Sequence, residues 1–497
     1  MAGPESNGRV RQLSAAALLV LVALMGCLLA NADAAPRSPE RCAPVAPSAA
    51  ALPTPEFDDG PMIARADLLA DFDAWLAGMR RLSPDLSIRS DIPRLDQEAA
   101  RIRRSLVHPM SRREAWLHFA RLNPYLRDGH NAIYMPNYRS ALEAHVRASG
   151  HIVPIEVRFA PDGSLRVFSV APGTDRVKPE DLVLSINGHS VRQMMHAMLA
   201  LSPGDTPASQ RAWAVRRFAM LYWYLYGDTR EYDLRVRSEL TGCSVLARLA
   251  GATTLPQALQ PDPKPGELFG WRILRGNIGY LRVDTFDPDQ AQVLARVARA
   301  AFTQFKRRDV KALIIDVREN GGGDDPLWQK DLMEYITDKP YAQLSHYKIR
   351  ITKREAGPGD VIGAVQEADY SKRFTPNRVD PIRFHGPVYI LVGPYSFSAT
   401  IQFVVAAQDF GIAKIAGEET AALSCQTGKY EQIHLPRTGL AAFTPVIAYT
   451  RPSGRGCGRG VVPNVPITTN EVEPENTLSS LVSRVKADLR IRTHGNT

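Results

Sequence analysis

Two serines in one loop have the setting of a nucleophile. Ser396 and Ser398 lie in the segment Gly393-Pro394-Tyr395-Ser396-Phe397-Ser398-Ala399-Thr400, between an apolar run at residues 388–392 and an apolar stretch at residues 401–410. A serine at a strand-to-helix turn places its hydroxyl at the positive end of the helix dipole, near free N–H groups. This position suits attack on a carbonyl carbon. Serine is also a preferred helix N-cap, so the loop alone leaves both interpretations open.

A run of three glycines is the second chemical feature. Residues 318–323 are Arg-Glu-Asn-Gly-Gly-Gly and directly follow the apolar run at residues 312–317. Consecutive glycines let the backbone approach a substrate and direct N–H groups at a developing negative charge. The glycine spacing of nucleotide-binding loops is absent, and Asp324 and Asp325 would repel a phosphate. The pattern favours an oxyanion-binding loop or a plain turn over a nucleotide site.

The third feature is the tripeptide Asp128-Gly129-His130. A neutral histidine is the commonest general base for a serine hydroxyl near neutral pH. The chain has 11 histidines, so His130 stands out only in combination with the other two loops. If it is the base, activity is expected to rise through an apparent pKa of about 6–7.

The elements around these loops alternate between strand and helix. After Trp271 the pattern predicts a strand at 278–283, an amphipathic helix at 290–305, buried strands at 312–317 and 388–392, and a helix that ends near residue 407. Buried strands that alternate with helices predict an α/β fold in which helices cover a sheet.

Upstream of this core the periodicity differs. Helical spacing dominates residues 61–149, whereas the alternation of residues 150–245 predicts strands, with a tight turn at Asn187-Gly188. The predicted organisation is a signal peptide at 1–35, a flexible lead-in at 36–60, a helical domain at 61–149, a strand-rich module at 150–245, a linker at 246–269, the core at 270–475 and a C-terminal helix or tail at 476–497.

The first 35 residues have the layout of a secretory signal peptide. Arg9 and Arg11 precede an apolar run at residues 15–30, and small residues follow it. The run is short for a membrane span, so no stable span is expected. A lipid anchor at Cys27 is the alternative, and we favour simple export to the periplasm or the exterior.

Cysteine usage agrees with export. Without Cys27 the chain keeps Cys42, Cys243, Cys425 and Cys457, which permit two disulfides in three connectivities. Cys425 and Cys457 lie in the same late region and are the favoured pair. The sequence has no Cys-x-x-Cys pair, and we expect no metal site.

The composition bounds the possible partners. The chain has 497 residues, 44% of them hydrophobic, with 61 Lys+Arg against 52 Asp+Glu, a net charge of +9. These values exclude a collagen-like, coiled-coil or mainly disordered protein. A mildly basic surface favours anionic surroundings, and for an exported protein the cell envelope explains it without nucleic acid.

Taken together, the three loops resemble the C-terminal processing (tail-specific) protease family and its tricorn-core relatives. Gly417-Glu418-Glu419-Thr420 and Gly460-Val461-Val462-Pro463-Asn464 add to the resemblance, which covers roughly residues 120–470. It implies a crotonase-like core of ββα units, preceded by a helical segment and a degenerate PDZ-like module at 150–245. It also implies a peptide or protein substrate and no cofactor.

Residue by residue, the resemblance implies that Ser398 is the nucleophile, with Ser396 as the second choice. The oxyanion hole would use backbone N–H groups of Ala399 and of Gly322 or Gly323. Asp409 matches an acid of the family that lies close to the site.

The base departs from the bacterial type of the family, which uses a lysine after the Gly-Glu motif. No lysine occupies that place here; Lys429 lies several residues beyond it and Lys414 lies in an apolar strand. Tricorn-like relatives use a Ser–His pair, which implies His130. Their supporting glutamate corresponds to Cys457, and Glu418 is a substitute candidate.

The sequence therefore predicts an exported serine endopeptidase that works through an acyl-enzyme on Ser398, with His130 as the base. The alternative is a catalytically inactive relative that binds a peptide or another ligand.

Overall fold

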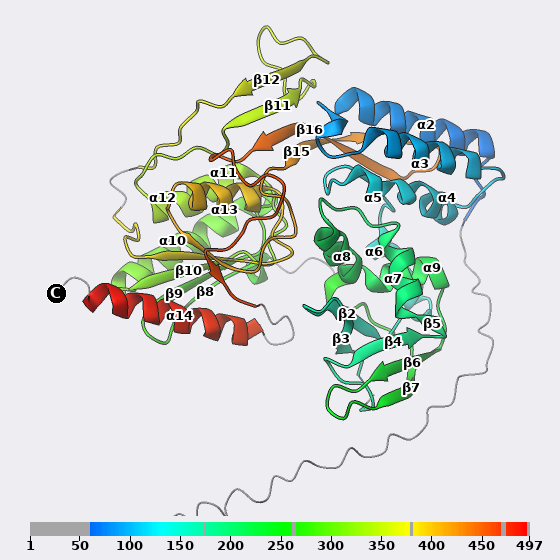
Figure 1. Ribbon diagram of the computed structural model, residues 1–497, viewed down its shortest axis with the longest axis horizontal. Helices are drawn as coiled ribbons and strands as arrows, with labels where there is room; N and C mark the ends of the chain where they lie inside the picture. The colour runs from blue at the N-terminus through cyan, green and yellow to red at the C-terminus, as the bar shows by residue number, and fades with distance from the viewer. Residues whose placement is uncertain (1–59, 173–174, 261–264, 378–380, 469–473, 495–497) are drawn as a thin grey trace, which may run out of the picture.

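The computed structural model describes residues 60–172, 175–260, 265–377, 381–468 and 474–494. They form an N-terminal helical part, a small sheet with its own helices and a larger core (Figure 1). The mixed α/β class predicted from the sequence is confirmed. The predicted signal peptide, the lead-in as far as residue 59, Cys27 and Cys42 lie outside the described residues.

Helices dominate the N-terminal part. Its elements are α2 (Arg65–Leu82), η1 (Leu86–Ile88), α3 (Ile92–Ser105), α4 (Arg112–Phe119), η2 (Ala120–Leu122), α5 (Asn123–Leu126), the short strand β1 (Ala132–Tyr134) and α6 (Tyr138–Arg147). Local chemistry sets the helix starts: the Asp91 side chain accepts from the Arg94 N–H, and Ser111 and Glu114 form a capping box. The tripeptide Asp128-Gly129-His130 lies in the connection between α5 and β1.

The second part is a twisted sheet with three helices. Its elements are β2 (Ile155–Phe159), β3 (Leu165–Val170), β4 (Leu182–Ile186), β5 (His189–Ser190), α7 (Val191–Leu199), α8 (Pro207–Arg216), α9 (Phe218–Tyr226), β6 (Glu231–Arg237) and β7 (Ser244–Ala250), in the sheet order β2-β3-β4-β6-β7. The predicted Asn187-Gly188 turn joins β4 to β5, with φ of 48° and 75°. Strand β7 runs to Ala250, past the predicted module end at residue 245.

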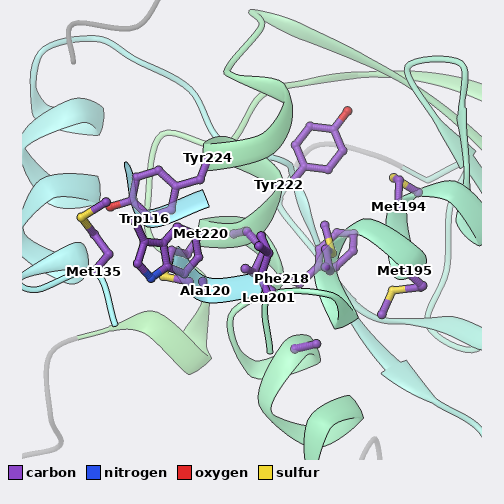
Figure 2. Close-up of a cluster of buried hydrophobic side chains, with 14 of the residues drawn as sticks. Trp116, Ala120, Met135, Met194, Met195, Leu201, Phe218, Met220, Tyr222 and Tyr224 are labelled. Carbon is purple, nitrogen blue, oxygen red and sulfur yellow. The ribbon is translucent and has the colours of Figure 1, made fainter. Parts of the chain in front are cut away.

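The helical part and the small sheet share one hydrophobic core. Figure 2 shows Trp116 of α4 against Tyr224 and Met220 of α9, and the Trp116 and Tyr224 ring centroids are 5.5 Å apart. The buried Asn123 side chain donates to the carbonyls of both Ile133 and Leu201, at 3.1 and 3.0 Å. The two predicted domains are therefore packed as a single unit around the loop that carries His130.

The core contains a six-stranded sheet in the order β17-β14-β13-β10-β9-β8. Its strands are β8 (Phe269–Leu274), β9 (Ile278–Val283), β10 (Ala312–Asp316), β13 (Val388–Val392), β14 (Lys414–Gly417) and β17 (Val465–Pro466). The helical elements that connect them are η5 (Pro288–Gln290), α10 (Ala291–Arg307), α11 (Asp325–Trp328), η6 (Gln329–Met333), α12 (Glu334–Ile336) and α13 (Ala399–Asp409). The two continuous apolar runs form β10 and β13, which pair in parallel and are buried throughout.

Helices cover both faces of this sheet. Side chains of α10 and α13 pack on one face, and α14 (Pro474–His494) packs on the other through Leu478, Leu481 and Val485. The last predicted segment, at 476–497, corresponds to this helix. The short η3 (Gln257–Leu259) and η4 (Pro265–Glu267) lie in the predicted linker before β8.

A third sheet joins the core to the N-terminal part. It contains β11 (His346–Arg350), β12 (Val365–Asp369), β15 (Thr427–Ile433), β16 (Ala441–Thr450) and β1, in the order β1-β16-β11-β12, with β15 also paired to β16. Strand β1 pairs antiparallel with β16, with Ala132 opposite Phe443. Figure 1 shows β15 and β16 passing under α2. This pairing brings the His130 loop to the start of β15.

Among the residues described here, no helix is both long enough and apolar enough to span a membrane.

Candidate active site

Ser398 lies at the turn between β13 and α13. Its backbone has φ 56° and ψ −125°, a region that residues with a side chain rarely occupy. Such a conformation costs on the order of 1–3 kcal/mol and persists only where neighbouring contacts hold it. Here the Phe397 N–H donates to Asn320 O at 3.1 Å, and the Gln426 amide donates to Ser398 O at 2.6 Å. The turn directs the Ser398 hydroxyl toward the His130 loop.

His130 meets that hydroxyl. Its Nε2 is 3.0 Å from Ser398 Oγ, although the two residues are 268 positions apart in the chain. The imidazole stacks on the Phe397 ring, with centroids 4.5 Å apart. The residue before His130 is Gly129. A Cβ at this position would lie 2.7 Å from the Phe397 ring, so the close packing of the His130 loop on Phe397 requires glycine. The structure therefore brings the two predicted residues within hydrogen-bond distance.

Burial determines the charge of His130. Only 7% of the residue is exposed, and this desolvation lowers its pKa to about 4, while the nearby Asp205 carboxylate raises the pKa and Arg89 lowers it. The imidazole is therefore neutral at pH 7 and able to accept a proton at Nε2. The pKa differs from the ordinary value of about 6–7 assumed from the sequence.

Asp128 is the carboxylate nearest to His130. Its Oδ1 accepts from the His130 backbone N–H at 2.8 Å and from the Thr427 hydroxyl at 2.8 Å, and lies 3.9 Å from His130 Nδ1. Burial and the charge of Asp205 raise the pKa of Asp128 to about 6. It is mostly ionised at pH 7.

Asp205 is a residue that the sequence analysis missed. It lies between α7 and α8, and its carboxylate accepts from the Gly129 N–H at 2.6 Å and from the Leu423 N–H at 3.1 Å. Asp205 thereby ties the His130 loop to the loop before β15. Its local sequence, Pro-Gly-Asp-Thr-Pro, resembles an ordinary turn, so no local signal marked it.

The glycine loop lies against the Ser398 turn. A Cβ at Gly322 would lie 2.6 Å from Ser398 Cβ and 3.0 Å from the Ala399 nitrogen, and Gly322 has φ 103°. The buried Asn320 side chain holds this loop, since its Oδ1 accepts from the Gly322 N–H at 2.9 Å and from the Thr400 hydroxyl at 2.6 Å. The Gly322 N–H is thus engaged, which corrects the expectation that it is free for an oxyanion.

Two other predicted oxyanion donors keep their N–H groups available. Within the described residues, neither the Ala399 N–H nor the Gly323 N–H has a hydrogen-bond partner. Ala399 is the first residue of α13, where the helix dipole adds positive potential.

A disulfide lies next to the site. Cys425 is bonded to Cys457, the pair favoured from the sequence. The next two residues are Gln426, which contacts Ser398 O, and Thr427, which contacts Asp128 and lies 3.5 Å from His130 Nδ1. The cross-link therefore anchors a segment that reaches both candidate catalytic residues.

Several predicted residues lie elsewhere. Asp409 ends α13, about 15 Å of helix beyond Ser398. There it pairs with Arg451, with Oδ1 and Nη2 2.6 Å apart, so it does not reach the site. Ser396 is fully buried and its hydroxyl donates to Val317 O at 2.8 Å, which is a structural role.

The two lysines also lie apart from the pair. Lys414 binds Asp488, with Nζ and Oδ2 2.7 Å apart, and Lys429 pairs with Glu355. The side chains of Asp128, Thr427 and Phe397 lie beside His130, and the Gln426 amide donates to the Ser398 carbonyl. In the described ranges no three His, Cys, Asp or Glu side chains gather as a possible metal site.

Comparison with known proteins gives independent evidence on the family that this chain resembles. Residues 277–467 match the model of Peptidase family S41. The carboxy-terminal processing protease CtpB of Bacillus subtilis (strain 168) is 23% identical over 197 residues, which is 37% of this chain and 34% of that protein. The match thus spans about a third of the curated relative's length.

Solved structures extend the likeness over most of the fold. Mature CPAF superposes with a TM-score of 0.61 at 16% identity, over 86% of this chain and 98% of that chain. Its complex with lactacystin gives 0.59 at 15% identity, over 85% and 98%. At this identity the superposition shows a shared fold. Residues 277–467 are therefore similar to Peptidase family S41 and to a carboxy-terminal processing protease, and the superposition shows that the fold around them is shared with mature CPAF.

Proposed function

We propose that this protein is an exported serine endopeptidase that cleaves peptide bonds through an acyl-enzyme on Ser398, with His130 as general base. The observation that carries the proposal is the 3.0 Å contact between His130 Nε2 and Ser398 Oγ at the start of α13. The Ser398 hydroxyl and the His130 imidazole lie within hydrogen-bond distance where α13 begins, and the Ala399 N–H at that helix start has no partner among the described residues, which supports acyl transfer.

The first half-reaction forms the ester. Ser398 Oγ attacks the carbonyl carbon of the scissile bond while its proton passes to His130 Nε2. The carbonyl oxygen becomes an oxyanion that accepts from the N–H groups of Ala399 and Gly323. As the C–N bond breaks, His130 returns the proton to the leaving amine. Water then repeats the sequence on the ester and releases the acid product.

The surroundings of His130 favour this role. A lowered pKa keeps the imidazole neutral before attack, and the Asp128 carboxylate stabilises the imidazolium that forms during it. Phe397 covers one face of the ring and limits the access of water.

Export is supported by two features of the chain. The N-terminal 35 residues have the composition of a signal peptide, and the Cys425–Cys457 disulfide persists in an oxidising compartment. The substrate is a peptide or protein, as the names of the relatives suggest for those proteins.

A fluorophosphonate probe tests the nucleophile. The wild-type protein is expected to be labelled and to hydrolyse an unstructured protein such as casein, whereas Ser398→Ala is expected to do neither. Ser396→Ala is the matched control: it loses a buried backbone contact and some stability but keeps labelling. A labelled Ser398→Ala protein would reject the assignment.

Histidine and lysine variants test the base. His130→Ala should lower kcat by about 10²–10⁴-fold, because that is the usual contribution of general acid–base catalysis. Lys414→Ala and Lys429→Ala should remain active, since both side chains pair with carboxylates away from Ser398. A well-folded wild-type protein that is neither labelled nor active would favour the non-catalytic, ligand-binding alternative.

A further inference from the structure

The Thr427 hydroxyl lies between the Asp128 carboxylate and Nδ1 of the His130 imidazole. The residue is 6% exposed and begins β15, directly after the disulfide-bonded Cys425 and the Ser398-bound Gln426. Its Oγ1 is 2.8 Å from Asp128 Oδ1 and 3.5 Å from His130 Nδ1. No comparison and no local motif assigns it a role.

The tautomer of His130 determines whether an acceptor is needed beside Nδ1. For Nε2 to accept the Ser398 proton, the single proton of the neutral ring must be on Nδ1. The ring is buried, so an Nδ1–H without an acceptor would cost about 1–3 kcal/mol. An acceptor on the Nδ1 side therefore decides whether the productive tautomer is populated.

Asp128 is poorly placed to be that acceptor alone. Its Oδ1 is 3.9 Å from Nδ1, beyond hydrogen-bond distance, and already accepts the His130 backbone N–H and the Thr427 hydroxyl. Thr427 is nearer to Nδ1. A hydroxyl has one proton to donate and two lone pairs to accept with, so Thr427 can donate to Asp128 and accept from Nδ1–H at once.

We propose that Thr427 is a positioning residue that links His130 to Asp128 in a one-directional chain. In this chain Ser398 Oγ–H donates to His130 Nε2, His130 Nδ1–H donates to Thr427 Oγ1, and Thr427 Oγ1–H donates to the Asp128 carboxylate. Thr427 keeps its proton throughout. Its hydroxyl is oriented by the Asp128 carboxylate, so that the hydroxyl oxygen stabilises the positive charge of the imidazolium. The hydroxyl replaces a direct carboxylate–imidazole contact. The inference rests on the proposed function, because it assigns a role within the same reaction.

The backbone fixes the hydroxyl in this position. Thr427 pairs with Ala448 of β16, the Tyr449 N–H donates to Gln426 O at 2.7 Å, and the disulfide holds Cys425. A buried residue at a strand start with both neighbours anchored has little freedom to move. The Thr427 side chain is thus preorganised for the transition state.

Three variants at two positions test the inference. Thr427→Val keeps the shape and removes the hydroxyl, and is expected to lower kcat about 10²-fold with little change in KM. Thr427→Ser restores the hydroxyl and is expected to recover most of kcat. The matched control is Thr438→Val, since Thr438 is also buried and also donates to a carboxylate, that of Asp71 at 2.8 Å, but lies away from His130. It should lose stability and keep kcat.

A spectroscopic measurement separates orientation from folding. Nitrogen-15 spectra of labelled histidine should show His130 protonated on Nδ1 in the wild type and in Thr427→Ser, and a mixture of tautomers in Thr427→Val. Wild-type kcat in Thr427→Val, or equal losses in the Val and Ser variants, would overturn the role of Thr427. Retained activity in Ser398→Ala would instead overturn the proposed function, so the two failures are distinguishable.

Discussion

The Gly129 N–H donates to the Asp205 carboxylate at 2.6 Å, which ties the loop before His130 to the connection between α7 and α8. The second carboxylate oxygen accepts from the Leu423 N–H at 3.1 Å, so one side chain joins three distant segments. The candidate site is therefore assembled from all parts of the molecule.

Removal of the Asp205 carboxylate should loosen this junction. Asp205→Ala leaves two buried N–H groups without an acceptor, which should lower the free energy of unfolding by about 2–4 kcal/mol and reduce kcat. Urea unfolding and steady-state kinetics measure both effects. Asp162→Asn is the control, because the Asp162 carboxylate accepts hydrogen bonds from Ser164 in an exposed turn. Equal stability of the Asp205→Ala and wild-type proteins would contradict the role of this contact.

Gly322 and Gly321 should respond differently to alanine. A Cβ at Gly322 would meet Ser398 Cβ at 2.6 Å and Phe397 O at 2.9 Å, so Gly322→Ala should displace the nucleophile and abolish most labelling by a fluorophosphonate. A Cβ at Gly321 meets no atom within 4 Å, and Gly321→Ala should label at close to the wild-type rate. The ratio of the two labelling rates is the measurement, and similar rates would show that the close approach has no effect on the site.

The pH dependence of activity follows from the two shifted groups. The pKa of His130 is lowered to about 4, so the imidazole stays a competent base well below pH 6. The pKa of Asp128 is raised to about 6, so its carboxylate loses charge as the pH falls through 6. We expect kcat/KM to fall partly near pH 6 and further near pH 4. In Asp128→Asn the step near pH 6 should be absent, and an unchanged step would assign it to another group.

The same groups make opposite contributions to stability. The lowered pKa of His130 means that the unfolded chain binds more protons between pH 6.5 and about 4, so this contribution is lost as the pH falls. The raised pKa of Asp128 means that the folded chain binds more protons between about pH 6 and 3.8, so its contribution is gained as the pH falls.

Single variants should separate these contributions. Between pH 6.5 and 4 the wild type should lose stability relative to His130→Ala, and between pH 6 and 4 it should gain stability relative to Asp128→Asn. Denaturant unfolding across this range measures both differences. Parallel stability curves for all three proteins would show that neither pKa is shifted by folding.

The Cys425–Cys457 disulfide should support both stability and turnover. It closes a loop of 32 residues, which corresponds to about 3–4 kcal/mol of unfolded-state entropy. The double variant Cys425→Ala/Cys457→Ala should unfold more readily and turn over more slowly, because Gln426 and Thr427 lose their anchor. A reductant should slow the wild type toward the rate of the double variant. An equally large effect of reductant on the double variant would trace it to another bond.

The sequence predicted those strands and turns whose residue pattern is local and continuous. The continuous apolar runs at β10 and β13 and the Asn187-Gly188 turn appear where the periodicity and turn chemistry placed them. The pairing of β1 with β16 had no such signal, because a three-residue strand among helices has too short a pattern to detect.

Only the site residues that belong to a sequence motif could be predicted. Ser398 and His130 belong to recognisable loops, whereas Asp205 and Thr427 act through contacts with segments more than 70 and 290 residues away. Asp409 illustrates the opposite error: a motif match placed it near the nucleophile, but the length of α13 carries it to the far end.

The strand pairing between β1 and β16 also has a consequence for biosynthesis. His130 emerges early from the ribosome, but the strand that draws its loop into place is encoded more than 300 residues later. A polypeptide in which β16 has not yet paired with β1 therefore lacks the contact between His130 and Ser398, and the proposed activity is expected to appear only after both strands have folded together.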